Sequence, residues 1–344
     1  MKAGTLLLRA DASVEMGTGH LMRCLALAEY WRDQDGQALL ATHCHLDPLL
    51  DRFRAEGVEV LKPRNGAASN QEADEISIHA KKIGANWIAL DGYQFSAEYH
   101  ERLSGAGAHV LLIDDNGHAG RYSADLVLDQ NLTAEENNYR KRSEKTRLLL
   151  GTKYVLLRRE FRAAKQRGSR QGERTRVFVS MGGSDPENVM AKVLRAISGC
   201  EHLEVRAVIG AGNRFLTAVQ RIAGQSRASM QLEIKANMSE LMAWADVAIS
   251  AAGATLWELA FMGVPTLTVE LVDHQRPIAR AFAEHGAGMN LGWHADLHDA
   301  KIVSELQAIS SDCARREAMS ARGRSMVDGC GPERAFAAMM DLSE

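Results

Sequence analysis

The feature that most constrains the fold of this chain is a repeated alternation of short apolar runs with longer amphipathic stretches. The apolar run 5–10 leads through a loop to residues 20–36, where apolar side chains recur at the spacing of one helix face and Gly36 stands where the helix should end. Buried strands that alternate with helices form parallel sheets, because parallel neighbours need a crossover connection. Strands are expected at 5–10, 38–42, 58–61, 87–91, 109–115 and 126–130, and again at 175–183, 204–212, 232–236, 246–253 and 265–271.

The segment 158–174 interrupts this alternation, because it is strongly basic, contains glycine and serine, and lacks an apolar run. A chain of 344 residues also exceeds what one hydrophobic core usually supports. We therefore expect an N-terminal Rossmann-like domain at 1–157, a linker at 158–174, a second Rossmann-like domain at 175–328, and a last helix within 329–344 that packs back on the first domain. Ligands of such sheets bind at the carboxyl ends of the strands, so we expect a shared cleft between the two domains.

The composition excludes several classes of protein. The net charge is 41 − 44 = −3 with histidine neutral, which argues against a broad nucleic-acid or membrane surface. Five scattered cysteines without a CxxC pair argue against a disulfide framework and a structural zinc site. No apolar run approaches the ~18 residues of a membrane span, and the first residues lack a signal sequence. We expect a cytoplasmic protein without metal or cofactor, and the sequence leaves its oligomeric state open, a monomer included.

The loop after the first expected strand contains the turn Gly17-Thr18-Gly19, followed at once by His20 at the start of a helix. Glycines let a backbone approach a ligand closely, and a helix N-terminus offers free N–H groups to an anion. The imidazole titrates near neutral pH and could accept a proton from water. The turn by itself favours a plain helix-start histidine, and it is no dinucleotide fingerprint because Met22 occupies the place of the third glycine.

Two later strands of the first half end in aspartate followed by polar turn residues, which makes Asp91, Tyr93, Asp114 and Asp115 candidates for the cleft. Capping of the next helix is an equally good interpretation of these aspartates. Adjacent residues such as Asp114 and Asp115 point to opposite faces of a strand, so a metal site is not favoured.

The second half contains three further loops of interest. Gly182, Gly183 and Ser184 follow a strand, and Asp185-Pro186 is expected to supply the N-cap and first residue of a helix. The small residues Gly253, Ala254 and Thr255 precede another helix, with Glu258 one turn further on. Such turns can hold a diphosphate, or simply allow close packing of helix on sheet. The turn at 182–184 lacks the lysine of an ATP-binding loop, so ATP hydrolysis is not supported. The run 270–276 is either a solvated loop or a substrate-facing one.

Together, "RADASVEMGTGHLMRCLALA", "LLLGTKYVLLRREF", "VFVSMGGSDPENV", "AISAAGATLWELAFMGVPTLTVEL" and "HQRPIARAFAEHGAG" resemble the UDP-sugar hydrolase of pseudaminic acid biosynthesis (PseG) from about residue 5 to about 292. The C-terminal half is also similar to the lipid II-forming MurG glycosyltransferase. Both families have the GT-B architecture. The resemblance implies an α/β fold of two doubly wound Rossmann-like domains with a nucleotide-sugar in the cleft between them.

The resemblance also implies roles for matching residues. His20 matches the catalytic histidine, Tyr93 an active-site tyrosine, and Glu258 a ribose-binding glutamate. Met238 matches the position whose backbone contacts uracil. The resemblance also places Gly17, Gly19, Gly253, Ala254, Thr255 and Gln275 on the substrate. From their places in the loops we add Arg9, Asp11, Thr18, Gly182, Gly183, Ser184 and Asp273.

One departure concerns the segment that commonly reads A-E-N-Q in the hydrolase family. Here it is Val272-Asp273-His274-Gln275. His274 in place of asparagine either indicates a different sugar or adds a second acid/base group, so we include it among the catalytic candidates.

The predicted reaction is metal-independent hydrolysis of a UDP-linked (di)acetamido-trideoxy sugar to UDP and free sugar. His20 takes a proton as water attacks C1, with inversion, in pseudaminic-type nonulosonic acid biosynthesis. The alternatives are a UDP-sugar glycosyltransferase and a non-catalytic nucleotide-sugar-binding protein. The block around His20 does not point to the other GT-B possibility, a UDP-sugar 2-epimerase.

Overall fold

The computed structural model describes residues 3–13, 15–164, 174–234 and 236–343. The chain divides into two compact units. The first combines Met1–Ser13, His20–Arg159 and Gly329–Glu344, and the second combines Glu160–Asp328 with the short loop that ends at Gly19. Most of the expected linker, residues 165–173, lies outside the described residues.

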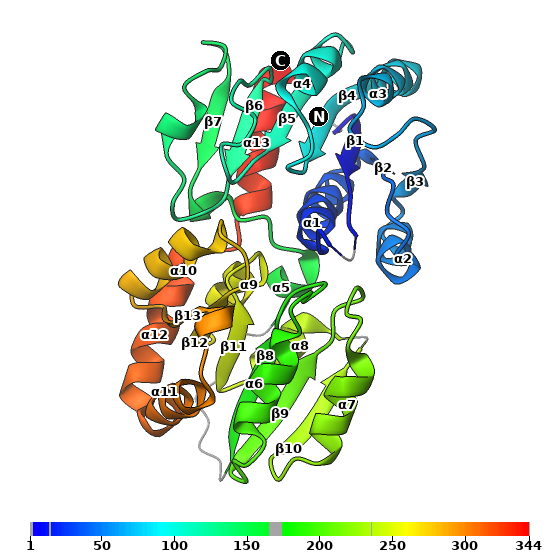
Figure 1. Cartoon of the computed structure of the whole chain (residues 1–344). Coiled ribbons are helices and arrows are strands. Elements are labelled where there is room, and N and C mark those ends of the chain that lie inside the picture. The colour runs from blue at the N-terminus through cyan, green and yellow to red at the C-terminus, as the bar shows by residue number, and fades with distance from the viewer. Residues whose placement is uncertain (1–2, 14, 165–173, 235, 344) are drawn as a thin grey trace. The chain divides into compact units, whose positions relative to one another are not determined.

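The first unit is built on one fully parallel sheet in the order β3-β2-β1-β4-β5-β6-β7 (Figure 1). The direction of strand addition reverses between β1 and β4, where Ala10 pairs with Asp91. In open α/β sheets this reversal opens a crevice beyond the carboxyl ends of the strands. The strands are β1 Thr5–Ala10, β2 Gln37–Ala41, β3 Glu59–Leu61, β4 Ala85–Asp91, β5 His109–Ile113, β6 Leu126–Asp129 and β7 Arg147–Leu150.

Helices cover both faces of this sheet, and each face has its own apolar core. Helices α1, α2 and α13 contribute to one core, and α3 and α4 to the other. The C-terminal helix is anchored by the Trp87 indole nitrogen, which donates to Ser343 Oγ at 3.0 Å. The helices are α1 Gly19–Asp33, α2 Asp47–Ala55, α3 Asn70–Ile83, α4 Ala97–Ser104 and α13 Gly331–Ser343, with the 3₁₀ turns η1 Glu136–Tyr139 and η2 Thr152–Tyr154.

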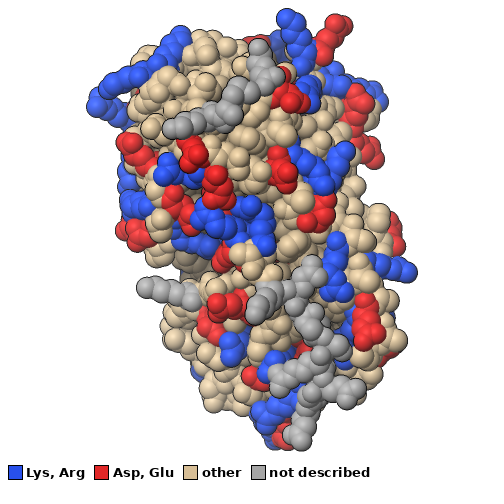
Figure 2. All heavy atoms as spheres, turned by 180° about the vertical axis from the view of Figure 1, so that it is seen from behind, with Lys and Arg blue, Asp and Glu red and all other residues tan. Residues whose placement is uncertain are grey.

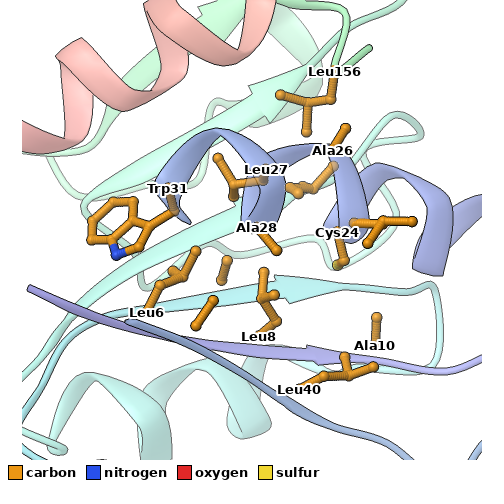
Figure 3. Packing of buried hydrophobic residues seen from close by; sticks show 14 of the residues in the cluster. Leu6, Leu8, Ala10, Cys24, Ala26, Leu27, Ala28, Trp31, Leu40 and Leu156 are labelled. Atoms are coloured by element: carbon orange, nitrogen blue, oxygen red, sulfur yellow. The ribbon is translucent and has the colours of Figure 1, made fainter. Parts of the chain in front are cut away.

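Helix α1 matters most for the site, because its buried face fixes the position of its first turn. Cys24, Ala28 and Trp31 lie over Leu6 and Leu8 of β1 (Figure 3). Burying this face removes several large apolar side chains from water, at roughly 1.5–3 kcal/mol for each large side chain. The packing therefore holds the start of α1 firmly at the carboxyl end of β1.

The end of α1 differs from expectation in detail. The helix ends at Asp33, and Asp35, not Gly36, takes the left-handed conformation with φ 58°. Gly36 is required for a different reason, because a side-chain carbon there would lie 2.3 Å from Trp31 Cδ1. The glycine thus makes room for the indole ring.

The second unit has a parallel six-stranded sheet in the order β10-β9-β8-β11-β12-β13, reversing between β8 and β11. Its strands are β8 Thr175–Ser180, β9 Leu203–Val208, β10 Ser229–Glu233, β11 Val247–Ala251, β12 Thr266–Glu270 and β13 Gly288–Trp293. Its helices are α5 Arg159–Arg162 (which starts at the last residue of the first unit), α6 Val189–Ile197, α7 Leu216–Gly224, α8 Met238–Trp244, α9 Thr255–Met262, α10 Gln275–Glu284, α11 Asp299–Ser311 and α12 Cys313–Met326, with the 3₁₀ turn η3 His294–Asp296.

The sequence pattern found the other strands but missed β7 and β13, and it placed β10 three residues too late. β7 has four residues and β13 contains two glycines, so neither gives a long apolar signal.

On the face seen in Figure 2, basic and acidic side chains are interspersed. Among the described residues, no helix is both long and apolar enough to span a bilayer.

Candidate functional site

His20 is the second residue of α1 and lies at the carboxyl end of β1, beside the end of β4. Only 6% of the residue is exposed. Its Nδ1 atom is 2.6 Å from Oδ1 of Asp91, the fully buried last residue of β4. The histidine predicted from the glycine turn is therefore paired with a carboxylate at the strand reversal of the first unit.

The carboxylate decides which ring nitrogen carries the proton. Ionised Asp91 can only accept hydrogen bonds, so we assign the proton of the neutral ring to Nδ1 of His20. Arg23 Nη2 also lies 2.9 Å from Nδ1, but a guanidinium is only a donor, so this contact is electrostatic. The lone pair of the neutral ring is then on Nε2. A histidine oriented in this way can take a proton from a hydroxyl group or a water molecule.

Arg23 connects two carboxylates from different strands. Its Nε and Nη2 donate to the two oxygens of Asp91 at 2.9 and 2.7 Å, and its Nη1 donates to Asp115 Oδ2 at 2.5 Å. The residue is 5% exposed. Such a fork of charge-assisted bonds has one favourable geometry, so Arg23 fixes the orientation of the Asp91 carboxylate.

Tyr93 completes the cluster from the loop after β4. Its hydroxyl donates to Asp115 Oδ1 at 2.6 Å, and its ring meets the His20 ring edge-on at 4.8 Å. Burial and the charge of Asp115 raise the pKa of Tyr93 well above its usual range, so the phenol stays neutral. Burial alone would raise the pKa of Asp115, but the Arg23 charge and the Tyr93 bond outweigh it and hold that pKa well below its usual range.

Asp114 turns away from this cluster and organises its own loop. Its carboxylate accepts from the Tyr122 hydroxyl at 2.6 Å, from the Asn116 amide at 2.9 Å and from His118 Nδ1 at 3.2 Å. The His118 ring lies edge-on to Tyr93 at 5.6 Å. Burial would lower the pKa of His118, but its bond to Asp114 raises it above its usual value. Asp114 is thus a turn-forming residue.

The helix-capping interpretation does not fit Asp91. The cap of α4 is Ser96, whose hydroxyl accepts from the Tyr99 amide. Asp91 instead serves His20 and Arg23.

Arg9 and Asp11 form a second buried network at the end of β1. Arg9 is 0% exposed and lies 2.7 Å from both Asp11 Oδ1 and Glu72 Oε1. Asp11 also accepts from the His43 amide at 2.7 Å. The charges of this network face one another within the first unit. A direct contact of Arg9 or Asp11 with substrate remains a prediction.

The glycine turn before His20 is partly buried. Gly17 takes a left-handed φ of 80°, which suits glycine, Thr18 follows, and Gly19 begins α1.

In the second unit, Gly182, Gly183 and Ser184 follow β8, and Gly182 has φ 80°. The expected N-cap and first helical residue, Asp185-Pro186, are wrong by three residues, because α6 begins at Val189 after Asn188. The physical reason is a tight turn in which Asp185 has φ 48° and its carboxylate reaches forward to the Val189 and Met190 amides at 2.8 and 2.9 Å. Burial raises the pKa of Asp185 to about 6, against these bonds.

The small-residue turn after β11 has the expected form. Gly253 and Ala254 are partly buried, and α9 begins at Thr255. Ala254, at the N-cap position, has no side chain that could satisfy the first amides of the helix. Glu258 is in the first turn and 9% exposed.

Two further predicted segments also lie at helix starts of the second unit. Met238 is the first, partly buried residue of α8. Gln275 is the first residue of α10, and its Oε1 accepts from the Leu271 amide at 3.0 Å. Asp273 and His274 are exposed just before it, and Asp273 pairs with Arg276 at 3.1 Å.

The structure therefore unites His20, Tyr93, Asp91 and Asp115, and adds Arg23, which the sequence reasoning missed. One signal was present, since Arg23 follows His20 by three residues and such residues share a helix face. Among the described residues, no three His, Cys, Asp or Glu side chains gather as metal ligands would.

Comparison with known structures defines the class of fold. The Acinetobacter baumannii MurG structure matches 99% of this chain and 100% of its own with a TM-score of 0.67 at 16% identity. The structure of UDP-GlcNAc 2-epimerase from Neisseria meningitidis bound to UDP-GlcNAc matches 98% of this chain and 100% of its own with a TM-score of 0.65 at 11% identity. The chain thus has the GT-B fold with two Rossmann-like parallel-sheet domains, as predicted.

Sequence comparison adds two relatives. Residues 176–329 match the glycosyltransferase family 28 C-terminal domain. The spore coat polysaccharide biosynthesis protein SpsG of Bacillus subtilis is 27% identical over 340 residues, 97% of each chain. The UDP-N-acetylglucosamine–N-acetylmuramyl-(pentapeptide) pyrophosphoryl-undecaprenol N-acetylglucosamine transferase of Methylococcus capsulatus is 37% identical over 96 residues, 26% of this chain and 27% of its own.

Proposed function

We propose that this protein hydrolyses a UDP-linked (di)acetamido-trideoxy sugar to UDP and free sugar in nonulosonic acid biosynthesis of the pseudaminic type. The observation that carries the proposal is the Asp91–His20 pair, which leaves a proton-accepting Nε2 at the strand reversal of the first unit. The relative named for polysaccharide biosynthesis and the family 28 domain support a nucleotide-sugar substrate.

The step requires one water molecule. Nε2 of His20 takes a proton from water as its oxygen forms a bond to C1 of the sugar. The bond between C1 and the diphosphate oxygen breaks, and its electron pair leaves with UDP. A single displacement inverts the configuration at C1, and general-base assistance of this kind contributes about 10²–10⁴-fold in rate.

We assign UDP to the second domain. In this proposal the amides at 253–255 and the turn at 182–184 meet the diphosphate charge, Glu258 contacts ribose and the backbone of Met238 contacts uracil. Uncapped amides at a helix start attract anions, which supports the first of these assignments.

The remaining assignments follow from the same reaction. Tyr93 lines the sugar side, as do Arg9, Asp11, Gly17, Thr18, Gly19, Asp273, His274 and Gln275. We propose domains at 1–157 and 175–328 with a linker at 158–174 and a closing helix in 329–344. We also propose a cytoplasmic location and no metal requirement, so excess EDTA should leave the rate unchanged.

The test is UDP release from a panel of UDP-amino sugars in water enriched in ¹⁸O. Attack at C1 places the label on the free sugar and not on UDP, and NMR of the first product reports inversion. His20→Asn should lower the rate by about 10²–10⁴-fold. His109→Asn is the matched control, because His109 is at the amino end of β5 and stacks on Trp87.

A UDP-sugar glycosyltransferase is the second candidate, and the family 28 domain favours it. It predicts UDP release only when a hydroxyl acceptor is added, with no ¹⁸O in the sugar product. A non-catalytic binder would bind UDP-sugars without releasing UDP. Full turnover by His20→Asn would contradict the proposed role of the dyad in either enzyme.

A further inference from the structure

We propose that Arg23 is a positioning residue that offsets the charge of the two carboxylates beside His20, so that the ring can accept a proton at Nε2. The inference rests on the proposed function only in taking His20 as the base. It assigns to an internal residue of α1 a property that can be measured on the ring itself.

Within the described part of the first unit, charged and titratable groups face His20 from four places. Asp91 is at the end of β4, and Tyr93 is in the loop that follows. Asp115 is beyond the end of β5, and its charge also acts on His20. Arg23 is on the same helix, with Nη2 2.9 Å from His20 Nδ1. Tyr93 is neutral, so the charges are two negative and one positive.

Two carboxylates without a counter-charge would stabilise the imidazolium form of His20. A ring that is already doubly protonated cannot take a proton from water. Arg23 removes this problem, because it is permanently charged, donates to both carboxylates and approaches the ring at Nδ1. Asp91 can then orient the His20 ring, because the positive charge of Arg23 largely balances the negative charge of the Asp91 carboxylate.

The magnitude is large enough to matter. A unit charge about 4 Å from a titrating group shifts the protonation midpoint of that group. The shift is roughly 0.8 pH units at the dielectric constant of water and roughly 3 pH units at an effective dielectric constant near 20. The site is almost fully buried, so screening by solvent is weak. Loss of the Arg23 charge should therefore move the protonation of His20 by about one pH unit or more.

A purely structural ion pair predicts a different behaviour. Removing one partner of a buried pair lowers stability and the amount of ordered site, which reduces the rate at every pH by the same factor. The charge-balancing role instead moves the acidic limb of the rate profile along the pH axis. A variant that removes a positive charge and a variant that removes a negative charge should therefore move the acidic limb in opposite directions.

The experiment compares Arg23→Gln, Arg23→Lys and Asp115→Asn, with Arg32→Gln as the matched control. Arg32 is in the last turn of the same helix and exposed, and it contacts the Gly36 carbonyl. The kcat/KM profile for UDP release is measured from pH 5 to 9. In parallel, NMR of the full-length protein with isotope-labelled histidine follows the ring of His20, assigned from the spectrum of His20→Asn.

We expect Arg23→Gln to move the acidic limb and the NMR midpoint upward by about one unit or more. Asp115→Asn should move both downward, while Arg23→Lys and Arg32→Gln stay within a few tenths of a unit of the wild type. A uniform loss of rate with unshifted midpoints, or shifts of the same sign in Arg23→Gln and Asp115→Asn, would overturn the inference.

The two measurements separate this inference from the proposed function. If wild-type protein releases no UDP from any sugar, the hydrolase proposal fails, but the NMR midpoints still decide the role of Arg23. If Arg23→Gln does not fold, judged by circular dichroism, Asp115→Asn decides it. An unchanged or upward NMR midpoint in that variant is then the overturning result.

Discussion

Replacement of Asp91 by asparagine tests the proposed catalytic dyad most directly, because it replaces one carboxylate oxygen by an NH₂ group and leaves the side-chain volume nearly unchanged. In the native site this carboxylate accepts from His20 Nδ1 at 2.6 Å and from Arg23 at 2.7 and 2.9 Å. An amide has one oxygen acceptor, and its NH₂ group donates. Arg23 competes for that oxygen, so the amide hydrogens face Nδ1 and favour the ring tautomer whose proton is on Nε2.

The wrong tautomer presents a hydrogen where the mechanism needs a lone pair. The corresponding change in a serine-protease triad costs about 10⁴-fold in kcat. We therefore expect Asp91→Asn to lower kcat by about 10³–10⁴-fold, or about 4–5 kcal/mol at 1.36 kcal/mol per tenfold, with little change in KM. Part of the Arg23 charge is also left unpaired in a buried site, which lowers the free energy of unfolding by up to roughly 3–5 kcal/mol.

The assay is steady-state UDP release at pH 8 and 15 °C, where a destabilised variant still folds, with the folded fraction measured by circular dichroism in the same buffer. NMR nitrogen shifts of the labelled histidine ring report the tautomer independently of turnover. Turnover within tenfold of wild type by folded Asp91→Asn protein would refute the dyad. So would a ring that keeps its proton on Nδ1 while activity is lost.

Three further outcomes follow from individual contacts. Tyr93→Phe keeps the ring contact with His20 but removes the hydrogen bond to Asp115, so we expect kcat/KM for UDP release to fall by roughly 10–100-fold. Tyr93→Ala removes both contacts and should lower kcat/KM further. Burial raises the pKa of Asp129 to about 7, so the folded state favours the protonated carboxyl and the free energy of unfolding falls as pH rises from about 4 to 7. Urea unfolding should therefore give a free energy of unfolding that is roughly 1–3 kcal/mol lower at pH 8 than at pH 5. This difference should be absent in Asp129→Asn. Gly36→Ala should lower stability by roughly 1–3 kcal/mol, because its methyl group would displace the indole it meets, and an unchanged Tm would contradict the close contact.

Much of the fold could be predicted because local patterns encode it. Apolar runs such as 5–10 and 109–113 are long enough to be recognised as buried strands, and helical periodicity marks α1. β7 and β13 escaped because a four-residue edge strand and a glycine-containing strand have weak patterns. The tight turn at Asp185 escaped because a left-handed aspartate looks like an ordinary helix cap in the sequence.

The site was predictable only where a residue's own position in the chain constrains its role. His20 directly follows a glycine turn at a strand-to-helix junction, and Asp91 ends an apolar strand. For Arg23 the one signal was its spacing of three residues from His20, and this is weak, because an arginine one turn into a helix normally belongs to the solvated face. Its partners are 68 and 92 residues away in the sequence, and the strand order β1-β4-β5 alone brings them together.

That same strand order explains why the charge-balancing residue belongs on α1. A base that sits at the reversal between β1 and β4 necessarily faces the ends of β4 and β5, where both Asp91 and Asp115 lie. A carboxylate is needed there to orient the ring, and every added carboxylate favours the protonated ring. His20 and Arg23 are both buried residues of α1, and residues three positions apart share a helix face. An arginine at this position can therefore balance both carboxylates while it approaches the ring at Nδ1.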